Sequence, residues 1–98
     1  MIMRQRFTWD PAKAASNLRK HGVSFEEAVR VFADPMAVTR QDRIENGEQR
    51  WQTIGAVGGF ALLLVAHMLW DDEAGVEVVR IISARRADRK ERRIYENG

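Results

Sequence analysis

The stretch V-E-V-V-R-I-I-S-A-R-R-A, residues 76–87, predicts a buried strand that ends in a cluster of arginines. An arginine within a core strand needs an anion, a carboxylate or a sheet edge, and Arg80 interrupts this apolar run. We therefore expect a strand over residues 76–83 with a charge near its centre. Five of its residues are apolar and β-branched, which suits a packed, pleated surface: Val76, Val78, Val79, Ile81 and Ile82.

Arg85 and Arg86 follow directly, so three guanidinium groups gather near one end of this strand. A guanidinium group is always charged, and its planar fork of donors matches a phosphate group. This pattern indicates a place where a polyanion is bound. The alternative is that Arg80 pairs with a cross-strand acidic residue and that the basic segment after it is a solvated helix. The residues alone leave both interpretations open.

Composition limits the class of protein. A chain of 98 residues with 45% hydrophobic and 31% charged residues predicts one globular domain, residues 1–98. There is no cysteine, so disulfides and thiolate zinc sites are excluded, and two histidines cannot fill a usual structural zinc site. We expect no metal and no cofactor. The longest apolar run, residues 60–69, is too short to span a bilayer, and no export signal opens the chain, so we expect a cytoplasmic protein.

The charges are unevenly distributed along the chain. Residues 80–93 hold seven basic and two acidic residues, and residues 1–22 hold five basic and one acidic. Two basic poles in a chain of net charge +2 favour a nucleic-acid partner over a membrane surface. The alternative is that these terminal segments simply carry surface charge.

Helix signals dominate the first third of the chain, after a short predicted strand at residues 4–9. Asp10-Pro11 predicts the start of a helix that Gly22 ends. Ser24 and Glu27 form a capping-box pattern for a second helix, which Asp34-Pro35 stops.

The rest of the chain is predicted to form strands and one last helix. We expect strands at residues 37–40, 50–57, 60–69 and 76–83, with a polar loop around Asn46-Gly47, a tight turn at Gly58-Gly59, and a final helix over residues 88–95. The predicted fold class is α+β, a small, mainly antiparallel sheet with helices packed on it, in the order β-α-α-β-β-β-β-α. The periodicities predict one core: Phe7, Leu18, Phe25, Val29, Phe32, Ile54, Leu62, Leu64, Val79 and Ile81.

Several segments together resemble a known family. The run F-T-W-D-P-A-K-A-A-S-N-L-R-K-H-G-V-S-F-E-E-A-V-R-V-F-A-D-P, residues 7–35, is similar to the opening of the BrnT toxins of bacterial type II toxin–antitoxin systems. G-E-Q-R at 47–50, I-G at 54–55, L-V-A-H at 64–67 and R-I-I-S-A-R-R-A at 80–87 continue the resemblance in register. Thr8 and Met68 depart from the family pattern, which more often has an acidic residue and a threonine there.

The resemblance implies a cytoplasmic ribonuclease with a RelE-like fold. It also implies a BrnA-like ribbon-helix-helix antitoxin that neutralises the toxin and through which the complex binds DNA. Two other classes stay open on the residues: a non-catalytic nucleic-acid-binding module that uses the same basic face, and an interaction domain whose arginines form structural pairs.

Metal-independent RNA cleavage by the ribose 2′-hydroxyl needs a proton acceptor, a proton donor and stabilisation of the phosphorane charge. Arg80 and Arg85 are the first candidates for charge stabilisation, and Arg86 is the next. His67 is the one histidine on a predicted strand, and its ordinary pKa suits general acid–base catalysis. The alternative for His67 is a core histidine bonded to a backbone carbonyl.

Other basic residues are expected to follow the RNA backbone: Lys20, Arg89, Lys90, Arg92 and Arg93. Trp51 and Trp70 either stack on bases or belong to the core or to a partner interface.

Overall fold

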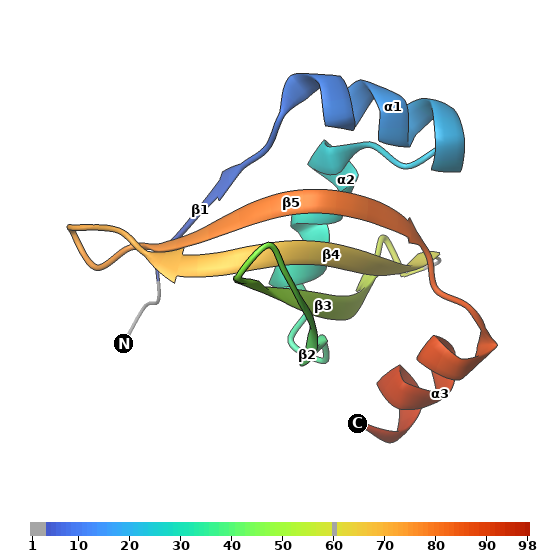
Figure 1. Ribbon diagram of the computed structural model, residues 1–98. Helices are drawn as coiled ribbons and strands as arrows, with labels where there is room; N and C mark the ends of the chain where they lie inside the picture. The colour runs from blue at the N-terminus through green and yellow to red at the C-terminus, as the bar shows by residue number, and fades with distance from the viewer. Residues whose placement is uncertain (1–3, 60) are drawn as a thin grey trace.

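The computed structural model describes residues 4–59 and 61–98 (Figure 1). The stretch that carries the arginines forms the last strand along the chain, and this strand lies next to one edge of a five-stranded sheet. The strands lie in the order β1-β5-β4-β3-β2. Their bounds are Gln5–Thr8 for β1, Val38–Glu45 for β2, Glu48–Val57 for β3, Ala61–Asp71 for β4 and Glu77–Arg86 for β5. Only the β1–β5 pair is parallel, so the prediction of a mainly antiparallel α+β sheet is confirmed.

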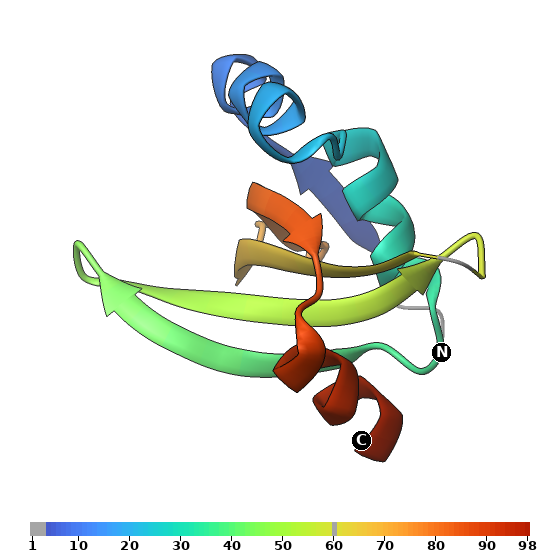
Figure 2. The ribbon, with the colours of Figure 1, turned by 90° about the vertical axis from the view of Figure 1, so that its right-hand side faces the viewer.

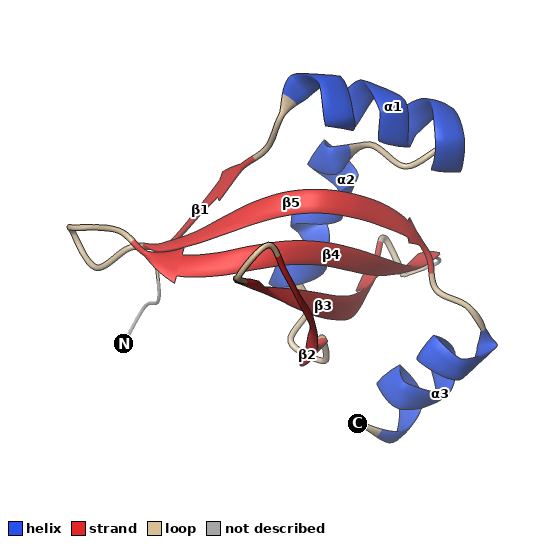
Figure 3. Cartoon of the chain, in the orientation of Figure 1, coloured by secondary structure: helices blue, strands red, loops and turns tan. Residues whose placement is uncertain are grey.

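The helices lie on both sides of this sheet (Figures 2 and 3). On one side are α1 (Pro11–His21), α2 (Phe25–Val29) and a 3₁₀ turn, η1 (Arg30–Ala33), that continues α2. On the other side, α3 (Arg89–Asn97) packs against one end of the sheet. The predicted order β-α-α-β-β-β-β-α is confirmed.

Helix capping follows the sequence signals. The Asp10 side chain accepts a hydrogen bond from the backbone N–H of Ala12, and Gly22 ends α1 with φ of 70°. Ser24 and Glu27 make the expected capping box at the start of α2. A second capping box, formed by Asp88 and Glu91, opens α3.

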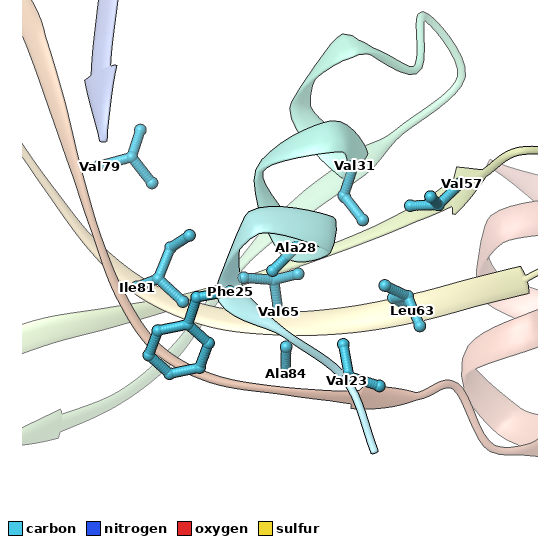
Figure 4. Close-up of a cluster of buried hydrophobic side chains, with 10 residues drawn as sticks. All are labelled: Val23, Phe25, Ala28, Val31, Val57, Leu63, Val65, Val79, Ile81 and Ala84. Atoms are coloured by element: carbon cyan, nitrogen blue, oxygen red, sulfur yellow. The ribbon is translucent and has the colours of Figure 1, made fainter. Parts of the chain in front are cut away.

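The main core lies between the sheet and the helices α1 and α2 (Figure 4). Its members are buried and apolar, among them Phe25, Val65, Val79 and Ile81. At Gly55 an added Cβ would lie 2.7 Å from Val31 Cγ1, so the glycine lets η1 approach β3 closely.

A second, smaller cluster lies on the opposite face of the sheet. Here Ile54 and Leu64 pack against Ile94 and Tyr95 of α3. The predicted core is therefore divided between two faces. The prediction for Leu18 is wrong: the residue is 51% exposed, because α1 covers the sheet with a narrow stripe that Leu18 does not join.

The four strands β2 to β5 are longer than predicted, and β2 differs most. β2 continues to Glu45 instead of ending at residue 40, because it is an edge strand where polar residues are tolerated on both faces. The loop expected around Asn46-Gly47 is a tight turn, with φ of 53° and 77° at these residues. The expected turn at Gly58-Gly59 is confirmed, and Phe60, where β4 was predicted to begin, lies outside the described residues.

One irregularity interrupts the pairing of β4 with β5. Ala66 pairs with Ser83, but the next residue, His67, pairs with Ile81. Ile82 is thus an extra residue on β5, which is the definition of a β-bulge.

Candidate functional site: a cationic hollow on the open face of the sheet

The two faces of the sheet can be assigned from the strand register, because directly opposed residues on neighbouring strands share a face. Leu63, Val65 and His67 of β4 face the helices α1 and α2. Leu64 and Met68 face the other way, and so do their partners on β5, Arg85 and Arg80. We call this second side the open face, because α3 covers only one end of it.

A hollow of about 510 Å³ lies on the open face, away from α3. Seven residues line it: Lys13, Glu48, Arg50, Met68, Trp70, Arg80 and Ile82. Three of them are cationic and one is anionic, so the hollow suits an anionic ligand.

Arg80 enters this hollow from the middle of β5. Within the described part of the chain it makes no ion pair, and its Nη1 lies 3.5 Å from Thr8 Oγ1. The interpretation that Arg80 pairs with a cross-strand acidic residue is therefore wrong. The structure places its charge on an uncovered sheet face, which explains how an arginine can interrupt an apolar strand.

Arg50 is a second cation of the hollow that the sequence reasoning missed. Its side chain is only 17% exposed, and its one ion pair among the described residues is a long contact of 3.8 Å from Nη2 to Glu45 Oε2. Its Nε is buried and has no hydrogen-bond partner in the described parts of the chain. A largely buried guanidinium group whose Nε has no hydrogen-bond partner is well placed to bind phosphate oxygens. The available signal was the G-E-Q-R segment at residues 47–50, which begins with the glycine of the Asn-Gly turn.

Lys13 was also missed, because it lies on a helix far from residues 76–87 in the sequence. Lys13, Asn17 and Lys20 share one face of α1 by their three- and four-residue spacing. They line a second, smaller hollow of about 190 Å³, which shares Lys13 and Ile82 with the first one. Lys20, a predicted RNA-binding residue, therefore lies beside the cationic hollow.

Asn17 attaches this face of α1 to the sheet. Its buried side-chain amide donates to the backbone carbonyls of Val23 and Ala84 at 2.9 and 2.8 Å and accepts from the Ala84 N–H at 3.1 Å. Asn17 lies one turn after Lys13, so these bonds fix the helix that carries Lys13 against β5.

Arg85 lies on the open face but outside the lining of the hollow. Its Nη1 and Nη2 donate to Glu91 Oε1 and Oε2 at 2.8 and 2.9 Å. This bidentate hydrogen bond holds the pKa of Glu91 below its ordinary value. Since Glu91 also caps α3, Arg85 anchors the start of that helix.

Arg86 and His67 do not join Arg80. Arg86 is exposed at the end of β5 and lies opposite Leu63, on the face of the helices α1 and α2. His67 lies on the same face and is fully buried, with its ring 5.0 Å from the ring of Phe32.

The environment of His67 is that of a neutral core residue. Its Nε2 lies 2.7 Å from Thr53 Oγ1, which in turn lies 2.8 Å from Thr39 Oγ1. Burial lowers the pKa of His67 to about 4. The ring is therefore uncharged at neutral pH and out of reach of a ligand in the hollow, so its predicted catalytic role is not supported by its position.

The remaining predicted RNA-binding residues, Arg89, Lys90, Arg92 and Arg93, are exposed on α3. They lie at the other end of the open face from the hollow. Tyr95 secures the end of α3, because its hydroxyl donates to Asp34 Oδ2 at 2.7 Å.

The described residues contain no group of three or more histidine, aspartate or glutamate side chains placed to hold a metal ion. None of the helices found there is long and apolar enough to cross a membrane.

Fold and site together define a class: a small α+β protein with a cationic hollow on the uncovered face of its sheet. Comparison with known proteins specifies the class further. The model of a family described as "Ribonuclease toxin, BrnT, of type II toxin-antitoxin system" matches residues 9–91. The chain therefore belongs to the BrnT family of ribonuclease toxins.

A solved structure supports the fold. The chain is similar to the crystal structure of the Brucella abortus ribonuclease toxin BrnT, with a TM-score of 0.60 and 20% sequence identity. The similarity covers 89% of this chain and 100% of that one. No curated protein sequence matches the chain.

Proposed function

We propose that this protein is an active, metal-independent endoribonuclease whose site is the cationic hollow. The observation that carries the proposal is that Lys13, Arg50 and Arg80, from three separate elements, surround one hollow together with the carboxylate of Glu48. Cations that converge from a helix and two strands are held in place by the fold, and preorganised charge is the usual means of stabilising a phosphorane.

The residues of the hollow supply the groups that the reaction needs. The ribose 2′-oxygen attacks the adjacent phosphorus, and Glu48 accepts the proton of the 2′-hydroxyl. Arg50 and Arg80 stabilise the negative charge on the phosphorane oxygens, each with a planar donor fork. The bond from phosphorus to the 5′-oxygen breaks, and Lys13 donates the proton that this oxygen takes. The products are a 2′,3′-cyclic phosphate and a 5′-hydroxyl end.

This assignment revises the predicted catalytic set. Arg80 is kept as a catalytic residue. Arg85 is assigned to anchoring α3, and Arg86 and His67 are left out because they lie on the other face. Arg89, Lys90, Arg92 and Arg93 extend the cationic surface beyond the hollow, where they would bind the phosphates of flanking nucleotides.

The proposal includes a partner and a compartment. A ribonuclease toxin must be inhibited in its own cell, so we expect a BrnA-like antitoxin with acidic or aromatic residues that cover Arg80 and the hollow. RNA and antitoxin would both be met in the cytoplasm. Hydrogen exchange of the toxin with and without its antitoxin tests the contact, and unchanged exchange around β5 would contradict it.

The activity itself is tested with purified protein and RNA in the presence of a chelator. We expect cleavage that leaves 2′,3′-cyclic phosphate ends, and a rate about 10²- to 10³-fold lower for Arg80→Ala, the scale for losing one preorganised donor. Arg19→Ala is the matched control, because Arg19 is an exposed arginine of α1 outside both hollows. Salt-sensitive RNA binding by the wild type without any cleavage would instead identify a non-catalytic binding module.

A further inference from the structure

The hollow contains one aromatic side chain that the proposed chemistry does not use. Trp70 is 42% exposed and lines the hollow with Lys13, Arg50 and Arg80. The other large apolar side chains exposed among the described residues, Leu18, Met36 and Ile44, lie outside it.

The position of Trp70 on β4 is fixed by the sheet. Its cross-strand neighbour Val78 is fully buried, and Met68, two residues earlier on the same face, is opposed to Arg80. The indole is therefore attached near the end of β4, the middle strand of the sheet, and lies on the same side as the guanidinium group of Arg80. A rigid aromatic ring next to cations matches the two parts of a nucleotide, a flat base and a phosphate.

We propose that Trp70 is a base-stacking residue that holds an unpaired nucleobase of the RNA while the adjacent cations hold its phosphate. The inference rests on the proposed function of the hollow and specifies its substrate. Stacking of a base on an aromatic side chain tolerates any base, because every base presents a flat π-face. Trp70 therefore distinguishes unpaired from paired RNA and does not distinguish one base from another.

Single-stranded RNA is the substrate class that follows. In a duplex each base is stacked on its neighbours and paired across the helix, so neither of its faces is free for an indole. Unstacking a paired base costs a few kcal/mol, and the binding of an unpaired base avoids this cost. The hollow should consequently prefer single strands to duplexes of the same sequence.

A docking site for a partner protein is the other use of an exposed tryptophan. The three cations around Trp70 favour a polyanion such as RNA over an apolar protein surface, which would have to desolvate them without supplying counter-charges. The acidic antitoxin expected at the hollow would compete with RNA for the same cations.

The test measures binding of 2′-O-methyl RNA, which lacks the free 2′-hydroxyl and so is not cleaved, as a short single strand and as the matching duplex. For Trp70→Ala we expect single-strand affinity to fall about 5- to 150-fold, the range found for one lost base–aromatic contact. Trp70→Phe keeps a π-face and should retain most of the affinity. Ile44→Ala removes an exposed apolar side chain outside the hollow and should bind as the wild type does.

Three further readouts separate stacking from a general loss of structure. The salt dependence of Trp70→Ala should keep the wild-type slope, because the phosphate contacts are unchanged. The duplex should bind more weakly than the single strand in the wild type, and Trp70→Ala should remove this preference. Single-stranded RNA should quench tryptophan fluorescence in the wild type and less in Trp70→Phe, and thermal melts should show that the variants are folded.

The inference is overturned if folded Trp70→Ala binds the single strand as tightly as the wild type, or if Trp70→Phe is as weak as Trp70→Ala. Normal RNA binding by Trp70→Ala with lost binding of the antitoxin would assign the residue to protein docking. Because the 2′-O-methyl RNA of this test cannot be cleaved, the test measures binding alone, and the cleavage assay with unmodified RNA measures the proposed activity. A wild type that binds single strands through Trp70 but cleaves no RNA would refute the activity and leave the stacking role in place.

Discussion

On the face of the sheet that α1 and α2 cover, Val65, Val79 and Ile81 are fully buried in the main core. Arg80, which lies between Val79 and Ile81 on β5, and Trp70, farther along β4 than Val65, lie on the open face and line the cationic hollow. Two adjacent residues of one strand can therefore have unrelated roles, since side chains alternate between faces. The comparison indicates that the proposed chemistry is confined to one face, whereas the other face supplies stability.

The largest effect is expected at Arg50, which the sequence reasoning missed. Arg50→Ala should lower the rate of RNA cleavage about 10²-fold or more, because it removes a donor held in the hollow. Arg80→Lys should restore only part of the activity lost in Arg80→Ala, since a point charge cannot reproduce two parallel hydrogen bonds. Single-turnover rates with saturating protein measure both effects. Wild-type rates in folded Arg50→Ala would place the site elsewhere on the protein.

The second prediction concerns His67 on the covered face. Burial lowers its pKa from 6.5 to about 4, so between these values the unfolded chain binds a proton that the folded chain does not. Stability should therefore be fully present above pH 6.5 and should decrease by about 3 kcal/mol as pH falls to about 4. Urea unfolding at pH 7 and at pH 4.5 measures this loss. Asp34 and Glu91, whose pKa values are also lowered, should add their own losses at still lower pH.

His67→Gln is the variant that sharpens this test. Glutamine does not titrate, so the loss of stability between pH 6.5 and 4 should be smaller than in the wild type. At neutral pH the folded variant should still cleave RNA at close to the wild-type rate. A folded His67→Gln that is inactive would show that the covered face takes part in the chemistry after all.

A smaller effect is expected where the open face meets α3. Arg85→Ala should lower the free energy of unfolding by about 1–3 kcal/mol, because it leaves the buried carboxylate of Glu91 without its bidentate partner. Partial exposure of Arg85 keeps the effect toward the lower end of the range. Arg86→Ala, at the neighbouring position on the other face, should change stability by less than about 0.5 kcal/mol. Equal losses in the two variants would contradict the assignment of Arg85 as an anchor.

The smallest effect is expected at the exposed cations of α3. Arg92→Ala should weaken RNA binding modestly and reduce the slope of log affinity against log salt concentration by about one phosphate contact. Titrations at several salt concentrations measure the slope. An unchanged slope would show that the RNA does not extend from the hollow to α3.

Local signals in the sequence predicted most of the fold. The capping patterns at Asp10 and Ser24 and the glycine turn at residues 58 and 59 act within a few residues, so they could be recognised without tertiary information. The parallel pairing of β1 with β5 and the full length of β2 depend on which strands lie at the edge of the sheet. No local pattern carries that information.

The site was predicted less completely than the fold. Arg80 was found because a charge inside an apolar strand is conspicuous in the sequence. Arg50 and Lys13 are ordinary residues of an amphipathic strand and a helix, and only the packing of α1 and β3 around β5 brings them to Arg80. His67 was proposed for catalysis because its chemistry is suitable, but burial removes both its charge and its access to a ligand.

The β-bulge at Ile82 changes which arginines share a face of the sheet. Arg80 and Arg85 are five positions apart, and strict alternation would turn them to opposite faces; the extra residue shifts the alternation by one, so both lie on the open face. The same shift directs Arg86 to the covered side. The side chains of R-I-I-S-A-R-R-A therefore alternate between the two faces in one register before Ile82 and in the opposite register after it. Deleting Ile82 would remove the bulge and leave Arg85 on the open face, now four positions from Arg80. Regular pairing of Ile82 would instead exchange the faces of Arg85 and Arg86 and separate α3 from its anchor, although no charged residue would be altered.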